Sequence, residues 1–260
     1  GVFGVAVPEE LGGAGSTVEV LLGMVDEAAA GLVPGPVATT ALATLVIEDP
    51  AILDALASGE RSAGLALDSD ITFAGGTASG SAKWVLGADP AGVLIVPAGD
   101  TWLLVDAAAD GVRIEPLTAT DFSRPLASVT LTSASAQPLS VPAQRVGDLA
   151  ATVLAAEAAG LARWLLDTAT EYAKVREQFG KPIGSFQAVK HMCAEMLLRS
   201  EQASVAAADA ARAAGEDDAA TDAAQLSIAA ALAASVGIEA AKANAKDCIQ
   251  VLGGIGITWE

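Results

Sequence analysis

The stretch VREQFGKPIGSFQAVKH, from Val175 to His191, joins two long helical patterns through a loop that contains glycine and proline. Upstream of it, Asp148 can cap a helix that runs to about Glu177, because a carboxylate accepts hydrogen bonds from the free N–H groups of a first turn. Downstream, Ser185 can cap a second helix that runs to about Ala214. The loop therefore connects two neighbouring helices of one domain.

A third helical pattern follows a polar turn at residues 215–218. It starts at Thr221 or Asp222 and runs to about Val251. Long helices with short connections are typical of an antiparallel bundle. The sequence thus predicts a helical bundle from residue 147 to residue 260.

The middle of the chain has a different period. Short runs rich in aliphatic and β-branched side chains occur at residues 93–96, 102–105, 112–114 and 127–131, and Gly, Pro and Asp separate them. This zone, residues 59–146, predicts a small antiparallel sheet domain.

The first 58 residues combine a glycine- and proline-rich opening with two helical patterns. Ser16 or Thr17 can cap the first, which ends near Ala30, and the second runs from about Thr39 to Ile47. We therefore expect an α+β fold that is mostly α, with a helical segment (1–58), a β domain (59–146) and a helical bundle (147–260). The outer two are expected to be incomplete, since the chain starts without Met and stops within a pattern.

Charge restricts the class of partner. Lys and Arg total 14 against 32 Asp and Glu, for a net charge of −18. Such a field repels nucleic-acid backbones and anionic membrane surfaces. It permits an anionic small molecule, which needs only a local basic pocket.

Sulfur and histidine content argue against a metal site. The two cysteines, Cys193 and Cys248, lie in helical patterns without metal-ligand spacing, and the chain has one histidine. Two isolated thiols indicate a reducing compartment.

No signal peptide is apparent, and the apolar run between Asp222 and Glu239 is too short and too alanine-rich for a membrane span. We expect a cytoplasmic protein without a bound metal.

The segment from Val175 to His191 resembles the signature region of the acyl-CoA dehydrogenase family. FGVAVPEELGGAG (Phe3–Gly15) and QVLGGIGITWE (Gln250–Glu260) are similar to two further stretches of that family. The order of the three zones matches as well, so the resemblance covers nearly the whole chain. It implies a C-terminal four-helix bundle, FAD as cofactor and the α,β-dehydrogenation of an acyl-CoA thioester.

The resemblance also implies six cofactor-binding residues. Arg176 matches the arginine that contacts the FAD pyrophosphate across a subunit interface, and a guanidinium fork suits phosphate oxygens. Phe179 matches an aromatic residue beside the adenine, and Gln187 a glutamine that hydrogen-bonds the adenosine half. The other matches fall where the backbone passes close to the FAD phosphates, and they are Gln250, Gly253 and Gly254.

Each assignment has a plainer structural alternative. Arg176 can complement the dipole at a helix C-terminus, and a Gly-Gly pair after a helix is commonly a C-cap. His191 is expected to pack between helices. Trp84 and Trp102 are more typical of a hydrophobic core than of a flavin contact.

The middle domain departs from the family pattern. Active members carry a Thr-Glu-Pro…Gly-Ser-Asp stretch and a Trp-Ile-Thr-type stretch around the flavin ring. The corresponding places are Gly64–Gly76, which lacks the motif, and Lys83–Gly92, which keeps only Trp84. We therefore expect the chain to lack a complete flavin-ring pocket of its own.

The catalytic base is unknown. The chemistry needs a carboxylate that removes an α-proton. One position used by some family members falls at about Ala150, which cannot act as a base, and most members supply the base from a loop beyond the stretch present here. Glu157, two turns further along, is more typical of a buried, paired helix carboxylate.

These departures match bacterial family members that are α2β2 heterotetramers, in which two chains build one FAD site. The leading hypothesis is an enzyme subunit in fatty-acid or steroid side-chain β-oxidation. It would form a homo- or hetero-tetramer with a related chain and pass electrons to an electron-transfer flavoprotein. The alternatives are a catalytically degenerate partner that completes the FAD site of a second chain, a scaffold that binds no flavin, and an oxidase.

Overall fold

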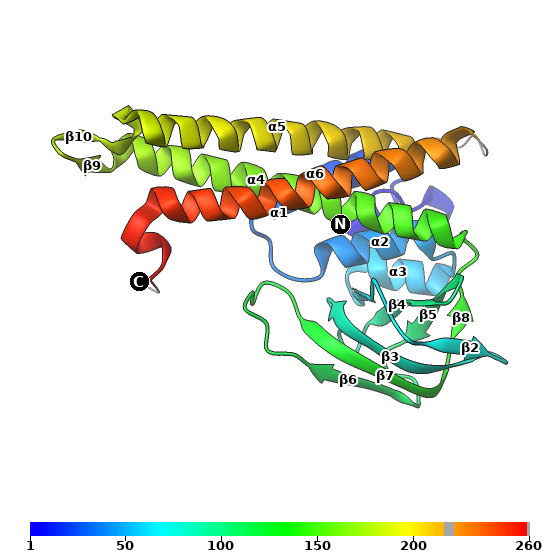
Figure 1. The fold of residues 1–260 in the computed structure, drawn as a ribbon. Coiled ribbons are helices and arrows are strands. Elements are labelled where there is room, and N and C mark those ends of the chain that lie inside the picture. The colour runs from blue at the N-terminus through cyan, green and yellow to red at the C-terminus, as the bar shows by residue number, and fades with distance from the viewer. Residues whose placement is uncertain (216–220, 259–260) are drawn as a thin grey trace. The chain divides into compact units, whose positions relative to one another are not determined.

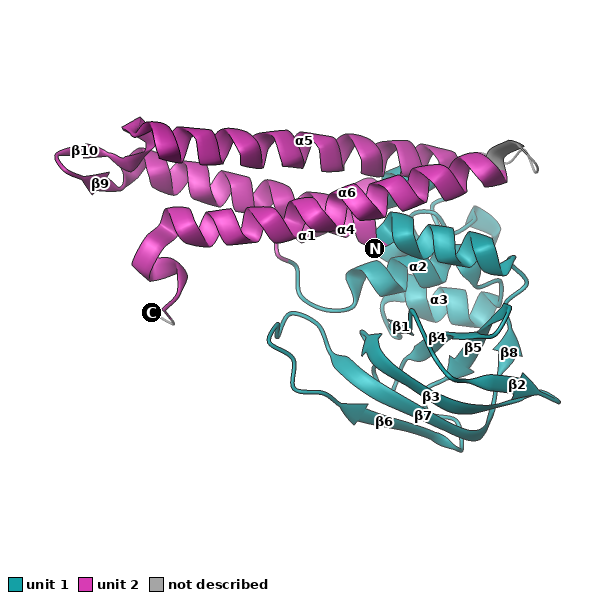
Figure 2. Ribbon diagram, in the orientation of Figure 1, with its two compact units in different colours: residues 1–22, 33–153 teal, residues 23–32, 154–260 magenta. Residues whose placement is uncertain are grey.

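The computed structural model describes residues 1–215 and 221–258 (Figure 1). The chain divides into two compact units (Figure 2). Unit 1 comprises Gly1–Leu22 and Val33–Val153, and unit 2 comprises Gly23–Leu32 and the chain from Leu154 onward. The fold class is confirmed as α+β and mostly helical. The finer division into three domains, with boundaries near residues 58 and 146, stays a prediction.

Unit 1 is built around an eight-stranded sheet with the order β6-β7-β3-β1-β4-β5-β8, and β2 pairs with β3. The four strands predicted from the sequence are confirmed as β4 to β7. The strands are β1 (Ala63–Leu65), β2 (Thr72–Ala74), β3 (Thr77–Leu86), β4 (Val93–Ala98), β5 (Thr101–Asp106), β6 (Val112–Pro116), β7 (Leu126–Ser135) and β8 (Gln137–Pro138).

The sheet is mixed, which corrects the expectation of a wholly antiparallel one. β1 pairs antiparallel with β3 but parallel with β4, with Ala63 opposite Val93 and Leu65 opposite Ile95. The chain leaves β1, forms the β2–β3 hairpin and returns on the other side of β1. Two reversals of direction restore the direction of β1, so β4 runs parallel to it.

The helices of unit 1 include one that the sequence patterns did not indicate. After the short 3₁₀ turns Val2–Gly4 and Glu9–Leu11 come α2 (Val37–Val46) and α3 (Pro50–Ser58), of which α3 was not predicted. Asp49 caps α3 by accepting hydrogen bonds from the N–H groups of Ala51 and Ile52, and Pro50 occupies the first helical position. Both features are typical of a helix start.

Unit 2 contains three long helices, α4 (Ala143–Val175), α5 (Gln187–Gly215) and α6 (Thr221–Leu252), together with residues 23–32 around the end of α1 (Val18–Ala30). The prediction that Asp148 caps α4 is wrong. The helix begins five residues earlier, just after Pro142, and Asp148 accepts a hydrogen bond from Gln144 Nε2 at 2.9 Å. Likewise α5 starts at Gln187, because Ile183–Ser185 form a 3₁₀ turn.

Small residues let the helices of unit 2 approach closely. A Cβ at Gly160 would lie 2.1 Å from the carbonyl oxygen of Asp26 on α1, so only glycine fits there. Alanines dominate one buried cluster between α4, α5 and α6, including Ala162, Ala207 and Ala240. The high alanine content therefore serves helix–helix contact as well as helix propensity.

A buried asparagine fixes the register of the three long helices. Asn244 on α6 is fully buried, and its Nδ2 donates to Ala162 O on α4 at 3.0 Å and to Met196 O on α5 at 3.1 Å. Its Oδ1 accepts from Arg199 Nε at 2.9 Å, and Arg199 also pairs with Asp247. Sliding any helix would leave these polar groups unpaired in the interior, which is costly.

A half-buried ion pair ties α1 to α4 within unit 2. Arg163 Nη2 lies 2.6 Å from Asp26 Oδ2 and 3.0 Å from Glu27 Oε1. The other carboxylate oxygen of Asp26 is buried and has no hydrogen-bond partner among the described residues. Burial, reinforced by Glu27, raises the pKa of Asp26 above its ordinary value, and Arg163 acts in the opposite direction.

Among the described residues, two helices are long and apolar enough to cross a membrane by length and composition alone, namely Ala143–Val175 and Ala223–Gly256. In their most apolar stretches, 56% and 33% of the residues are buried within the protein. Core helices of globular proteins pass the same test, so the expected lack of a membrane span stays a prediction.

We expect Asn244→Ala to lower the free energy of unfolding by about 1–3 kcal/mol, because it leaves the carbonyl groups of two helices without their buried donor. Chemical denaturation monitored by circular dichroism measures this. Lys246→Ala, at an exposed position two residues along α6, serves as the control and should change stability little. Equal stability of Asn244→Ala and the wild type would contradict the register role.

We also expect a pH-dependent difference between the wild type and Asp26→Asn. A carboxyl whose pKa is raised by folding contributes stability at low pH, and that contribution is lost as the pH rises through the folded pKa. The unfolding free energy of the wild type minus that of Asp26→Asn should therefore fall as the pH is raised from about 4, the ordinary pKa of an Asp carboxyl, through the raised pKa of Asp26 in the folded protein. A difference that stays constant or rises, measured by urea denaturation, would contradict the burial of this charge.

Candidate cofactor-binding site

The loop between α4 and α5 is a small hairpin made of β9 (Glu177–Gln178) and β10 (Lys181–Pro182). Lys181 pairs with Gln178 and Pro182 with Glu177, so Phe179 and Gly180 form a two-residue turn. Both turn residues have positive φ, 52° for Phe179 and 75° for Gly180, which is the requirement of a type I′ turn. Glycine adopts this conformation freely, whereas a phenylalanine there costs about 1–2 kcal/mol.

The strained Phe179 is held at the surface. Its side chain is 93% exposed, and its ring meets the ring of Phe186 edge-to-face with centroids 6.2 Å apart. The ammonium of Lys181 lies 4.4 Å from the centroid of the Phe186 ring. Strain at an exposed aromatic residue is an indication of function, since neither hydrophobic burial nor turn preference accounts for it.

Arg176 lies between the end of α4 and the hairpin. Its N–H donates to Tyr172 O at 2.9 Å, and its carbonyl accepts from the Ile183 N–H at 2.7 Å. The residue is exposed, and its guanidinium forms no ion pair or hydrogen bond with any residue that the structure describes. Hydrogen bonds thus hold both backbone polar groups of Arg176, while its guanidinium is exposed. A cation at the C-terminus of α4 can also complement the helix dipole.

Gln187 opens α5 and is exposed. Its Nε2 lies 2.9 Å from Nε2 of His191, one turn further along the helix. The expectation that His191 packs between helices is wrong, since this residue is exposed. The imidazole holds the glutamine amide on the surface, which the sequence patterns did not indicate.

The C-terminal motif lies at the same end of unit 2. A hydrophobic cluster joins the end of α4, the start of α5 and the end of α6, with Ala173, Met196 and Val251 buried and Ile183 and Val189 packed against them. The exposed residues of the last turn of α6 and of the 3₁₀ turn after it include Gln250, Gly253 and Gly254. Figure 1 shows the β9–β10 hairpin and this turn at one end of the helices. All six predicted residues therefore gather at one end of unit 2.

This end is locally basic in an acidic chain. Between positions 174 and 190 there are four basic residues and one acid, Glu177. The basic residues are Lys174, which pairs with Glu171 just before this range, and Arg176, Lys181 and Lys190. Basic side chains near exposed backbone and the exposed ring of Phe179 suit a phosphate-bearing ligand.

Comparison with known proteins identifies the family. The chain is 68% identical over 262 residues to acyl-CoA dehydrogenase FadE34 of Mycobacterium tuberculosis; the match covers this whole chain but only 36% of that protein. It is 37% identical over 268 residues to acyl-CoA dehydrogenase IpdE2 of Mycobacterium tuberculosis, and here the match covers this whole chain and 74% of the relative.

The chain belongs to the acyl-CoA dehydrogenase family.

Two further comparisons agree. The family model for the C-terminal domain of acyl-CoA dehydrogenase matches residues 145–260. The solved structure of a G363A variant of the Tcur3481-Tcur3483 steroid ACAD is similar with a TM-score of 0.86 and 29% identity, over 99% of this chain and 76% of that one. The family resemblance and the fold expected from it are confirmed.

Membership of this family implies FAD as the cofactor, and the exposed groups at the basic end are compatible with its dinucleotide half. The guanidinium of Arg176 has no partner among the described residues, and nothing lies within 4 Å of where a Cβ would stand on Gly253 or Gly254. Gly253 also has a φ of 64°, which favours glycine. Open backbone, an available guanidinium and exposed amides fit a diphosphate and an adenosine.

Two segments of unit 1, Gly64–Gly76 and Lys83–Gly92, correspond to the family stretches around the flavin ring. Polar side chains of the first segment form hydrogen bonds with other residues of unit 1. Ser69 Oγ donates to Pro97 O at 2.5 Å, and Asp70 accepts hydrogen bonds from the backbone N–H and hydroxyl of Ser81. Trp84 sits at a bulge of β3 with a φ of 58° and is 65% exposed, so the expectation that it belongs to the core is wrong. The polar groups of these segments are thus engaged within unit 1, whereas the strained Trp84 side chain stays exposed.

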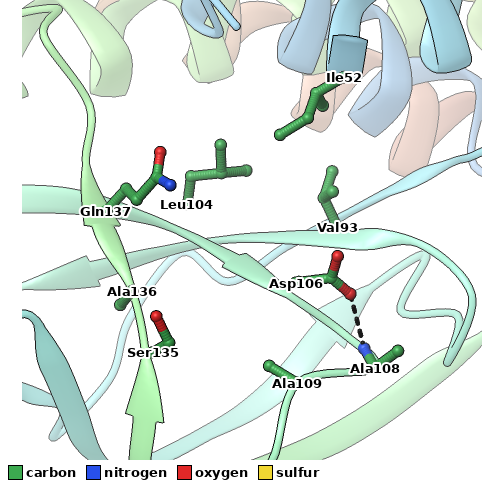
Figure 3. Close-up of a pocket in the computed structure, with 9 residues that line it drawn as sticks. All are labelled: Ile52, Val93, Leu104, Asp106, Ala108, Ala109, Ser135, Ala136 and Gln137. Atoms are coloured by element: carbon green, nitrogen blue, oxygen red, sulfur yellow. Dashed lines mark hydrogen bonds between the residues drawn. The ribbon is translucent and has the colours of Figure 1, made fainter.

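A hollow of about 420 Å³ in unit 1 does not replace that pocket. It lies beside β5 and the end of β7, and Leu104, Asp106 and Gln137 are among its lining residues (Figure 3). The Asp106 carboxylate accepts from the Ala108 N–H at 2.9 Å and pairs with Arg61 at 3.0 Å. Its charge is therefore already compensated within the unit.

The two positions considered for a catalytic base give no candidate. Ala150 is buried, and Glu157 is half-buried on α4. Sequence reasoning also overlooked Lys181 and Phe186, although both lie in the quoted segment. Their relation to Phe179 depends on the hairpin geometry, which spacing alone does not reveal.

Proposed function

We propose that this chain is part of an FAD-dependent acyl-CoA dehydrogenase that catalyses the α,β-dehydrogenation of an acyl-CoA thioester. The observation that carries the proposal is the exposed guanidinium of Arg176 beside a strained aromatic turn, at the basic end of an acidic chain. Family membership supplies the reaction class. The chain spans about a third of FadE34, so the activity of the whole protein belongs to the proposal.

The residues of this chain act on the dinucleotide half of the cofactor. Arg176 binds the diphosphate through its guanidinium fork, and Phe179 offers a ring to the adenine. Gln187 hydrogen-bonds the adenosine half, and the backbone of Gln250, Gly253 and Gly254 comes close to the phosphates. The bound flavin supplies a hydride acceptor for the β-carbon while a base takes the α-proton.

The site is composite in this proposal. Every assigned residue is exposed on this chain, so further residues must close the site and exclude water. A related acyl-CoA dehydrogenase chain is the partner that we propose, in a homo- or hetero-tetramer, with an electron-transfer flavoprotein as acceptor and a cytoplasmic location. The similar steroid ACAD carries two protein names, Tcur3481 and Tcur3483, which supports a two-chain arrangement.

A second candidate function follows from unit 1. Ser69 is hydrogen-bonded to the Pro97 carbonyl and Asp70 to the Ser81 N–H, so neither side chain is directed to a cofactor by these contacts. No catalytic base has been assigned in this chain. These observations favour a catalytically degenerate subunit that completes the FAD site of another chain. Both candidates share the composite site and differ in which chain holds the flavin ring.

The substrate class is an acyl-CoA of fatty-acid or steroid side-chain β-oxidation. The similarity to a protein named as a steroid ACAD supports the second of these. The acyl group would contact residues other than the six assigned to the cofactor. Those six residues therefore do not determine the length of the acyl group.

We expect Arg176→Ala to weaken FAD binding about 30-fold, which corresponds to ~2 kcal/mol for the loss of a charge-assisted pair. The flavin-to-protein ratio of the chain co-purified with its partner, read from the visible absorbance after gel filtration, measures the effect. Arg176→Lys should lie between, since it keeps the charge and loses the fork.

Arg212→Ala is the matched control. This arginine pairs with Asp209 at 3.1 Å near the opposite end of α5, so its loss should leave the flavin content unchanged. Equal flavin retention in Arg176→Ala and the wild type would overturn the assignment of the basic end.

A further inference from the structure

One exposed side-chain contact at the basic end has a defined hydrogen-bond direction. Gln187 is the first residue of α5, and His191 lies one turn further along, where residues four apart are neighbours on one face of a helix. The amide nitrogen Nε2 of Gln187 lies 2.9 Å from the ring nitrogen Nε2 of His191. Both residues are exposed, so burial does not account for their pairing.

The chemistry of the two groups determines which of them donates. An amide nitrogen is a donor only, whereas a ring nitrogen of a neutral imidazole either donates or accepts. A hydrogen bond between these two nitrogens therefore requires an unprotonated Nε2 on His191, with the ring proton on Nδ1. The imidazole is thus the acceptor and the Gln187 amide the donor.

This direction leaves the amide oxygen of Gln187 for a ligand. Among the described residues, Gln187 Oε1 has no hydrogen-bond partner. A glutamine at the exposed start of a helix otherwise samples several rotamers and both orientations of its amide, and ordering it opposes binding. The contact with His191 orders the side chain before a ligand arrives and directs an acceptor outward.

The charged groups around the imidazole do not replace this contact. On α5, Lys190 and Glu195 lie close to His191 in the sequence, and both are exposed. The 3₁₀ turn Ile183–Ser185 before the start of α5 carries no charged residue. In the described part of the chain, the imidazole bonds to none of the charged residues on the elements that meet at this end, which are Glu171 and Lys174 on α4, Arg176, Glu177 and Lys181 in the loop, and Lys246 and Asp247 on α6.

We propose that His191 is a positioning residue for FAD: its unprotonated Nε2 holds the Gln187 amide so that Oε1 accepts a hydrogen bond from the adenosine half of the cofactor. The inference rests on the proposed function, which places FAD at this end of unit 2. His191 acts through Gln187 and does not itself contact the cofactor.

Protonation of His191 reverses the direction of the contact. Both nitrogens of an imidazolium donate, so Nε2 would then face the amide nitrogen as a second donor. The amide relieves this conflict by turning over, which places Oε1 on His191 and the NH₂ group toward the cofactor. FAD binding should therefore weaken as the pH falls through the range in which imidazoles take up a proton, between about 8 and about 5.

The test is an FAD titration of this chain co-purified with its partner and freed of flavin. Flavin fluorescence measures the affinity at about pH 8 and about pH 5.5, on either side of the imidazole titration. We expect the wild type to bind FAD about fivefold more weakly at the lower pH, which corresponds to one neutral hydrogen bond. His191→Phe keeps a ring but lacks the acceptor, and it should show the weaker binding at both pH values.

Two amide variants test the geometry. His191→Gln carries its amide at the same distance along the side chain as Nε2 and does not titrate, so it should bind FAD like the wild type at about pH 8 and lose the pH dependence. His191→Asn is one methylene shorter and should behave like His191→Phe. Glu201→Gln, at an exposed position about three turns further along α5, is the matched control and should keep the wild-type profile.

A second readout does not depend on FAD. In nitrogen NMR spectra of protein labelled at histidine, the signals that His191→Gln removes should show a protonated Nδ1 and an unprotonated Nε2 at about pH 8. Signals with the proton on Nε2 would overturn the proposal, because the amide oxygen of Gln187 would then face the ring.

Two binding results would also overturn the positioning role. In the first, His191→Phe binds FAD as tightly as the wild type at about pH 8, although Arg176→Ala binds it more weakly. In the second, the ratio of the two affinities is the same at both pH values. Failure of the proposed function would instead show as a wild-type pair that takes up no flavin, or as FAD binding that neither Arg176→Ala nor His191→Phe changes.

Discussion

The amide of Asn244 is the contact on which the candidate site depends. It sits fully buried among α4, α5 and α6 and bonds to backbone or side chain on both other helices. A buried amide tolerates one register only, whereas the surrounding alanines would pack almost equally well after a shift of one turn. The polar contact therefore supplies the specificity that an alanine-rich interface lacks.

That register brings together two segments far apart in the sequence. With Asn244 bonded to α4 and α5, the last turn of α6 comes to the end of α4 and the start of α5, where one hydrophobic cluster holds all three. Arg176 and Gln187 then share an end of the unit with Gln250. The hydrogen bonds of Asn244 in the middle of the helices therefore determine where Arg176 lies at their end.

The features that were predictable from the sequence are those that local patterns determine. Branched side chains between turn residues indicate the strands from residue 93 to residue 131. The six site positions come from the resemblance of two segments to the family, and their role in binding FAD stays a prediction. The parallel pairing of β1 with β4 depends on which side of β1 the chain returns, and the start of α4 was misplaced because Asp148 bonds to Gln144 inside the helix. The strain at Phe179 and the exposure of Trp84 depend on a turn and a bulge, for which spacing gives no signal.

In our proposal this chain presents half of a flavin site and needs another chain to complete it. The most direct measurement is the FAD content of this protein purified alone and purified with a related acyl-CoA dehydrogenase chain. We predict a colourless protein alone and a stoichiometric flavin on the pair. Stoichiometric FAD on this chain alone would contradict the need for a different partner chain, because copies of this chain would then supply the flavin-ring pocket among themselves.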